Sequence, residues 1–121
     1  SAPHVFAVGD AIDRLNLTPM ATAVGHALAD TLFGDNPRAA SYENVPTAVF
    51  TSPPIGTVGL SEAEAVAKHG PCDIYVTRFT PMRHTISQRE GRKTLMKLLV
   101  DQASQRVVGA HMLGEDGAEI M

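Results

Sequence analysis

Apolar residues recur at helical spacing in the first third of the chain. The four that share one face of the expected helix are Met20, Val24, Leu28 and Leu32. Thr18 can cap the free amides at the start of this helix, and Pro19 suits its first position. Gly34 follows the last periodic residue in the usual terminating role. The pattern therefore predicts a helix between Thr18 and Gly34.

A short apolar run, HVFAV at residues 4–8, precedes this helix and is stopped by Gly9 and Asp10. Continuous apolar runs of this length are typical of a strand buried on both faces of an α/β sheet. The polar residues 35–44 read as a linker that follows the helix. We expect a domain boundary here, with residues 1–44 in one domain and residues 45–121 in the next.

From residue 45 onward the pattern changes to short strands separated by turns. The expected strands are residues 47–51, 55–60, 74–79, 94–100 and 107–113. Ser61 and Glu64 form a capping box that opens a short helix, which Gly70 closes. Residues 101–105 form the turn of a hairpin. The fold class is α+β, a mostly antiparallel sheet with flanking helices preceded by a strand–helix unit.

The last residues of the chain open one more helix. Asp116 is a suitable cap, and Glu119 follows three residues later, as in a capping box. A helix this short is not stable alone, and the first strand likewise has no preceding partner. Both ends are therefore expected to be severed, so that residues 45–121 form a truncated domain.

Bulk properties exclude several classes of protein. The chain is 44% hydrophobic with a formal net charge of -3, which argues against a nucleic-acid surface. Four basic residues do gather, at Arg83, Arg89, Arg92 and Lys93. Glu90 lies among them, which favours a solvated loop. No apolar run reaches the roughly 18–20 residues of a membrane helix, and the first residues show no signal-peptide pattern. We expect a cytoplasmic protein that binds neither membrane nor nucleic acid.

Motifs of catalysis and metal binding are missing from the sequence. Cys72 is the only cysteine, so it reads as structural or exposed. The five histidines show no zinc-ligand spacing, and no nucleophile elbow or phosphate-binding glycine loop occurs. No catalytic or metal-binding residue is therefore assigned.

The segment from Gly9 to Thr18 has two interpretations. Gly9 can admit a ligand to the backbone, Asp10 can accept hydrogen bonds from sugar-type hydroxyls, and the helix start offers amides and a positive dipole end. Alternatively, Asp10 is an ordinary turn residue and the helix is simply capped.

Seven segments in order resemble the pyridine nucleotide-disulfide oxidoreductases, above all the glutathione reductases and next the trypanothione reductases. They are HVFAVGD (4–10), LTP (17–19), PTAVF (46–50), PIGTVGL (54–60), FTPM (79–82), LMKL (95–98) and VGAHMLG (108–114). The resemblance runs essentially end to end. It implies that residues 1–44 end an FAD-binding domain and that residues 45–121 belong to the dimerisation domain.

The resemblance also implies site residues. Asp10 would hold the ribityl chain of FAD, and the amides near Leu17 and Thr18 would face the pyrimidine edge of the flavin, beside Gly9. A second set would meet the disulfide substrate: His26, Thr80, Met82 and Arg83. Many glutathione reductases carry an arginine where this chain has His26, so the substrate could be another disulfide.

As a function, the resemblance implies part of an NADPH-dependent, FAD-containing glutathione-disulfide reductase that is a homodimer. The redox cysteine pair and NADPH domain of that family would precede Ser1, and its catalytic His–Glu pair would follow Met121. The piece alone is therefore expected to be inactive and to retain neither cofactor. The alternatives are a trypanothione or other disulfide reductase, and a stand-alone dimerisation module.

Overall fold

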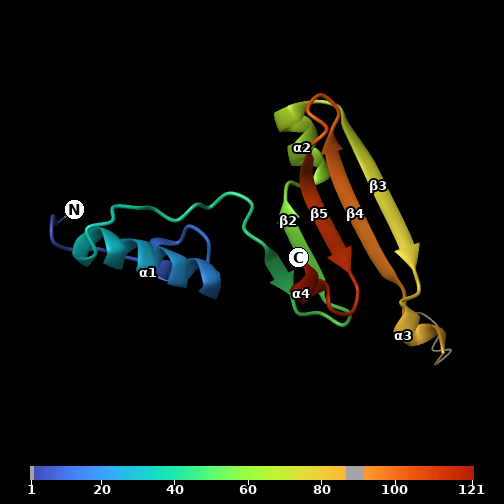
Figure 1. The fold of residues 1–121 in the computed structure, drawn as a ribbon, viewed down its shortest axis with the longest axis horizontal. Helices are drawn as coiled ribbons and strands as arrows, with labels where there is room; N and C mark the ends of the chain where they lie inside the picture. The colour runs from blue at the N-terminus through green and yellow to red at the C-terminus, as the bar shows by residue number, and fades with distance from the viewer. Residues whose placement is uncertain (1, 87–91) are drawn as a thin grey trace. The chain divides into compact units, whose positions relative to one another are not determined.

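The computed structural model describes residues 2–86 and 92–121 and contains two compact units, Ser1–Glu43 and Asn44–Met121. Each unit is described separately below. Figure 1 shows the long helix of the first unit and the sheet of the second.

The first unit consists of a 3₁₀ helix, η1 (Gly9–Ile12), and the long helix α1 (Thr18–Phe33). The helix predicted from apolar spacing is confirmed, and Gly34 ends it by donating its amide to the Asp30 carbonyl. The predicted cap is wrong by one residue, because Leu17 occupies the N-cap position and Thr18 is already helical. Leu17 has no side-chain oxygen to accept an amide, so α1 begins without a side-chain cap.

The chain after α1 runs back along the helix. Arg38 forms an ion pair with Asp30 at 2.5 Å, and its backbone amide donates to the Thr31 hydroxyl at 3.1 Å. Arg14 lies over the ring of Tyr42, 4.0 Å from its centroid. These contacts hold the polar segment after Gly34 against α1 and against the loop that precedes α1.

The strand predicted for residues 4–8 is wrong. These residues form no strand, and Val5 and Phe6 are 74% and 54% exposed. A strand requires a neighbour to take its backbone hydrogen bonds. No described segment of this unit pairs with residues 4–8, so the apolar run stays as exposed coil.

The second unit is built on a five-stranded antiparallel sheet with the order β1-β2-β5-β4-β3 (Figure 1). The strands are β1 (Thr47–Val49), β2 (Ile55–Gly59), β3 (Cys72–Phe79), β4 (Thr94–Asp101) and β5 (Val107–Leu113). Together with its helices, this sheet confirms the α+β class and the antiparallel arrangement that the sequence predicts.

The predicted hairpin of β4 and β5 is confirmed, and both of its strands lie inside the sheet. Leu98 pairs with Ala110, and the register shifts by a bulge after Leu99. The buried carboxylate of Asp101 accepts the amides of Ala103 and Ser104, each at 3.1 Å. A carboxylate that accepts backbone amides from its own turn closes the hairpin tightly.

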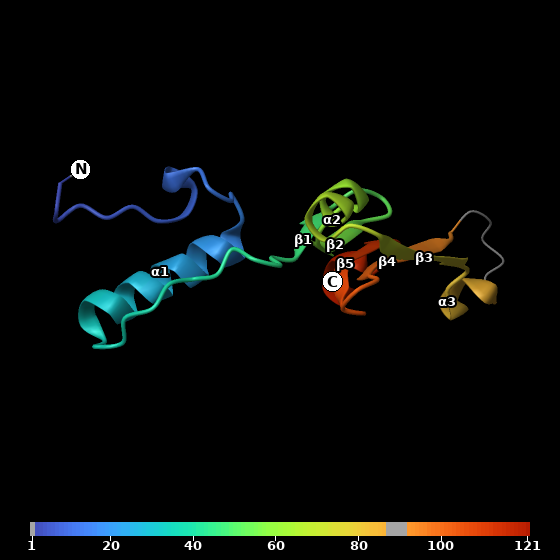
Figure 2. The same cartoon turned by 90° about the horizontal axis from the view of Figure 1, so that it is seen from above.

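Two helices lie on opposite faces of the sheet, as Figure 2 shows for α2 and the C-terminus. On one face lies α2 (Glu62–His69), opened by the predicted capping box and joined to the sheet by an ion pair between Glu62 and Lys97. On the other lies α4 (Gly117–Ile120), where the Gly117 carbonyl sits so close to Gly56 that a side chain there would overlap it. Ala65 and Leu99 are fully buried on the side of α2, and Met112 is buried on the side of α4.

Two details of this unit differ from the sequence-based expectation. The strand β3 was expected to be half-buried, but Tyr75 and Val76, on its opposite faces, are both more than half exposed. The reason is that β3 is an edge strand at the far end of the sheet from β1. The one-turn helix α3 (Met82–Thr85) follows β3 and was not predicted, because four residues show no periodicity.

Candidate functional site

Gly9 lies where the backbone turns into η1, with a φ of +65°. A β-carbon on Gly9 would lie 3.1 Å from the β-carbon of Ala21 in α1. The glycine therefore suits both a left-handed backbone and a close approach to the helix. That approach brings η1 against α1, so the predicted Gly9, Asp10 and Thr18 belong to one small unit.

The first turn of α1 offers unpaired backbone donors. Ala21 is the first helical residue whose amide reaches a carbonyl of the preceding turn, that of Leu17 at 3.0 Å. The amides of Thr18 and Met20 precede this point, and Pro19 has no N–H. The helix start thus presents two donors and the positive end of the helix dipole.

Asp10 is the second residue of η1, and its carboxylate is exposed. Its backbone carbonyl accepts a hydrogen bond from the Asp13 amide at 3.0 Å. Among the described residues, no side chain forms a hydrogen bond or ion pair with its carboxylate. An exposed carboxylate can accept hydrogen bonds from the hydroxyls of a flavin nucleotide. The free amides at a nearby helix start can donate to the electron-rich edge of the flavin ring. The Asp10 carboxylate and the Thr18 amide are therefore chemically suited to FAD, whereas the Leu17 amide already donates to the Leu15 carbonyl at 3.0 Å.

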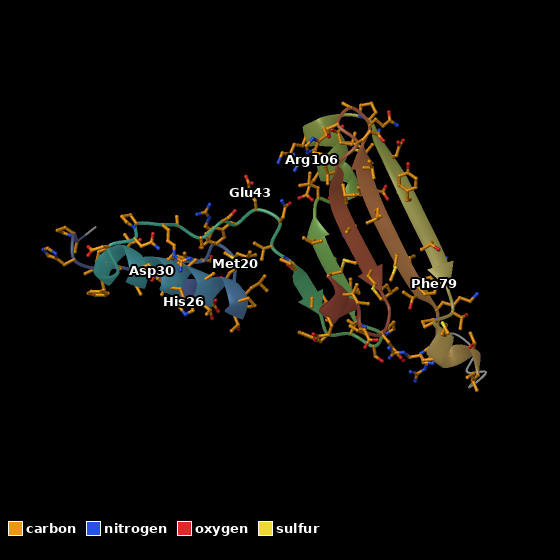
Figure 3. All side chains as sticks on the ribbon, viewed as in Figure 1. Met20, His26, Asp30, Glu43, Phe79 and Arg106 are labelled. Atoms are coloured by element: carbon orange, nitrogen blue, oxygen red, sulfur yellow. The ribbon has the colours of Figure 1, made fainter. Side chains whose placement is uncertain are left out.

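His26 lies in the middle of α1 with an exposed side chain (Figure 3). It belongs to the first unit, whereas Thr80, Met82 and Arg83 belong to the second. The predicted substrate residues thus fall into two groups, and each is described within its own unit.

Residues 80–81 connect β3 to α3 next to Phe79 at the end of the strand (Figure 3), and Met82 and Arg83 open α3. Thr80 is exposed, and Met82 is 87% exposed at the first position of α3. Arg83 is half-exposed, with its guanidinium bonded to the Asp116 carboxylate. The structure thus brings Thr80, Met82 and Arg83 together on one exposed segment.

Glu115, which was not predicted to have a role, is the centre of a cluster of charges. Nε2 of His84 lies 2.9 Å from its Oε2, and Arg92 bonds to its other oxygen. Arg83 lies 3.6 Å away and bonds also to Asp116. The hydrogen bond from His84, together with Arg92, holds the pKa of Glu115 below its usual value. Glu115 therefore stays ionised at neutral pH.

A cleft of about 350 Å³ opens beside this cluster. Its wall is formed by Ser52, Pro53, Pro54, Pro81, His84, Arg92, Lys93 and Glu115. The walls of the cleft come from the loop between β1 and β2, the start of α3 and the residues around Arg92 and Glu115. Segments that are far apart in the sequence therefore meet here.

The cluster could not be found in the sequence because His84 and Glu115 are 31 positions apart. The charge pattern of the basic residues from Arg83 to Lys93 predicts a solvated loop, and the resemblance adds a substrate role for Arg83 alone. In the structure Arg83 and Arg92 are both ion-paired and half-exposed, whereas Arg89 and Glu90 lie outside the described residues.

Other chemistry is sparse in residues 2–86 and 92–121. Cys72 is half-buried, and its thiol lies 3.5 Å from the Gly70 carbonyl. Within these ranges no group of three or more His, Cys, Asp or Glu side chains could hold a metal ion. No helix in the described part of the chain is long and apolar enough to cross a membrane.

Comparison with known proteins gives close relatives over the whole chain. The chain is 52% identical to the glutathione reductase of a Nostoc species, covering 100% of the chain and 27% of the relative. It is 47% identical to the chloroplastic/mitochondrial glutathione reductase of Pisum sativum, over 99% of the chain and 22% of the relative. The trypanothione reductase of Trypanosoma congolense is 40% identical, over 100% and 25%. The chain thus spans about a quarter of the length of these curated relatives.

A solved structure with a similar fold is the Cu(II) complex of the HOCl-induced flavoprotein disulfide reductase RclA from Escherichia coli. It superposes with a TM-score of 0.80 at 28% identity, over 99% of this chain and 28% of that one. Residues 45–121 match the family described as the pyridine nucleotide-disulphide oxidoreductase dimerisation domain. The chain therefore belongs to the pyridine nucleotide-disulphide oxidoreductases, and residues 45–121 are its dimerisation domain.

Proposed function

We propose that this chain is part of an NADPH-dependent glutathione-disulfide reductase that contains FAD and is a cytoplasmic homodimer. The observation that carries this proposal is the identity of 47–52% to glutathione reductases along essentially the whole chain. Trypanothione reductases are less similar, at 37–40%. Glutathione disulfide is therefore the preferred substrate of the proposal, with trypanothione disulfide as the alternative.

Residues 1–44 would end the FAD-binding domain and hold one side of the flavin. FAD, when bound, supplies the redox chemistry that carries electrons from NADPH toward a disulfide. In the proposal, the carboxylate of Asp10 accepts hydrogen bonds from the ribityl hydroxyls. The amides at the start of α1, beside Leu17 and Thr18, donate to the ring edge, where the helix dipole favours negative charge.

Residues 45–121 would supply the dimer interface, and residues 80–83 would meet the disulfide substrate bound by the partner subunit. The exposure of Thr80 and Met82 supports this assignment, because both side chains are accessible at the end of β3. Met82 offers an apolar contact to the substrate, and Arg83 offers a cation near its carboxylates. His26 would contact the substrate from the other domain.

The test is the NADPH consumption of the purified full-length protein with each disulfide. We expect rapid loss of NADPH absorbance with glutathione disulfide and a much lower kcat/KM with trypanothione disulfide. The 121-residue chain alone should be colourless and inactive, because the remainder of the flavin and dithiol site is missing from it. A full-length protein that reduces neither disulfide would overturn the proposal.

Asp10 provides a sharper test of the flavin site. In the full-length protein, Asp10→Asn should weaken FAD binding by roughly 10- to 100-fold, because hydrogen bonds to a charged acceptor are replaced by bonds to a neutral one. The measurement is the FAD content after dialysis and the Kd from flavin fluorescence. The matched control is Asp13→Asn in the same turn, whose carboxylate accepts a bond from Asn16 at 3.2 Å. Equal FAD affinity in the two variants would remove Asp10 from the site.

A further inference from the structure

The segment that carries Thr80, Met82 and Arg83 has almost no apolar packing of its own. The helix α3 is a single turn without a side-chain cap, and such a helix is not stable by itself. Met82 and Ile86 are 87% and 92% exposed, so these apolar side chains do not attach α3 to the sheet. His84 is the one buried residue of α3. The position of the segment must therefore depend on polar contacts.

Those contacts converge on Glu115. The buried ring of His84 donates from Nε2 to the Glu115 carboxylate at 2.9 Å, and Arg83 lies 3.6 Å from the same carboxylate. The backbone transmits this restraint to the rest of the segment, because the His84 amide donates to the Pro81 carbonyl at 2.8 Å. His84 and Pro81 are therefore linked within one turn of backbone.

The other end of this link is fixed to the sheet. Gly114, just before Glu115, is buried and donates its amide to the Pro54 carbonyl at 3.1 Å. A β-carbon on Gly114 would lie 2.6 Å from the hydroxyl of Thr94, which is itself buried. Glu115 therefore extends from a tightly packed part of the backbone, whereas the segment it holds is exposed.

Asp116 extends the same link. It adopts a left-handed conformation with a φ of +67°, which aspartate tolerates better than most residues other than glycine. The sequence predicts that its carboxylate caps α4, but the structure shows no such cap. The carboxylate bonds instead to the Arg83 guanidinium. Two consecutive carboxylates thus hold the two consecutive residues Arg83 and His84.

We propose that Glu115 is a positioning residue that, through His84 and Arg83, holds residues 80–83 in the orientation in which they meet the disulfide substrate. This inference rests on the proposed function, which puts these residues beside the substrate. In this proposal Glu115 acts through His84 and Arg83, and not by contact with the substrate or the flavin. Its effect is to fix, before the substrate arrives, a segment that would otherwise sample many positions.

The test uses the full-length dimer and the substitution Glu115→Gln, which keeps the size of the side chain and removes its charge. We expect the KM for glutathione disulfide to rise by roughly 10- to 100-fold, because misplaced contacts weaken productive binding. The kcat at saturation, the KM for NADPH, the FAD content and the dimer should stay as in the wild type. NADPH-dependent reduction of a quinone, which needs only the flavin, should also be unchanged.

The matched control is Glu119→Gln, an exposed glutamate in α4. A second variant, Asp116→Asn, weakens the contact with Arg83 alone and should raise the same KM by a smaller factor. If Glu115→Gln has the same KM for the disulfide as Glu119→Gln, the positioning role is wrong. If Glu115→Gln loses FAD, dimer or quinone reduction together with disulfide reduction, the residue is merely structural and the proposal is also wrong.

These results are distinguishable from failure of the proposed function. If the wild-type full-length protein does not reduce glutathione disulfide, the proposed function fails and the inference fails with it. If the wild type is active and Glu115→Gln binds the disulfide normally, only the inference fails.

Discussion

Leu99→Ala should lower the free energy of unfolding of the 121-residue chain by about 2–5 kcal/mol, the usual cost of removing a fully buried leucine side chain. Leu99 has no solvent exposure and lies in β4 on the face that α2 covers. It pairs with Gly109 of β5, which leaves room for the leucine side chain. Alanine would leave a cavity between α2 and the sheet.

The neighbouring leucine provides the control for this measurement. Leu98 is in the same strand but points to the opposite face, where it is 41% exposed. Leu98→Ala should cost about 1 kcal/mol, because less apolar area returns to water and no closed cavity forms. Urea unfolding followed by circular dichroism gives both values. Equal losses for Leu98→Ala and Leu99→Ala would show that the core does not lie under α2.

Gly59→Ala should destabilise the same unit by about 2–5 kcal/mol, from backbone strain and steric overlap together. Gly59 ends β2 with a φ of +78°, which disfavours any side chain. A β-carbon there would lie 2.4 Å from the Val108 carbonyl oxygen. That carbonyl accepts the Leu60 amide at 2.9 Å, so it cannot move away without losing a hydrogen bond.

Gly70 separates the two contributions in this experiment. It ends α2 with a φ of +85°, and a β-carbon there would meet nothing within 4 Å. Gly70→Ala therefore carries strain without overlap and should cost about 1–3 kcal/mol. The excess loss in Gly59→Ala, from thermal or urea unfolding, measures the overlap with Val108. Two equal losses would mean that the backbone near Val108 relaxes freely.

Local patterns in the sequence predicted the elements whose stabilising contacts lie within a few residues. The Ser61–Glu64 box forms with the Ser61 amide donating to Glu64 at 2.9 Å. The hairpin turn closes on the Asp101 carboxylate. The helix α1 follows the spacing of its apolar residues, although its cap is displaced from Thr18 to Leu17. Capping, turn chemistry and helical periodicity are all short-range, so one sequence is sufficient to find them.

The pairing of residues 4–8 and the burial of β3 depend on distant neighbours, and both were predicted wrongly. Residues 4–8 have the composition of a buried strand, but without a pairing strand they remain coil. The strand β3 has an alternating pattern, yet its edge position leaves both Tyr75 and Val76 largely exposed. The burial of a strand residue depends on the strands and helices packed around it, and the alternating pattern of a strand does not show which of these are present.

The candidate site divides in the same way. The sequence by itself predicted the turn at Gly9 and Asp10 and the helix start after Leu17, because turn and helix-start signals lie in consecutive residues. The contacts of these residues with a flavin stay a prediction. Through the resemblance of its motif, the sequence also predicts that residues 80–83 meet the substrate, and this stays a prediction. Only the tertiary structure decided that Glu115 meets His84, because the two residues are 31 positions apart and the sheet brings the end of β5 beside α3. A contact between distant residues is set by the register of the strands between them, and that register exists only in the folded chain.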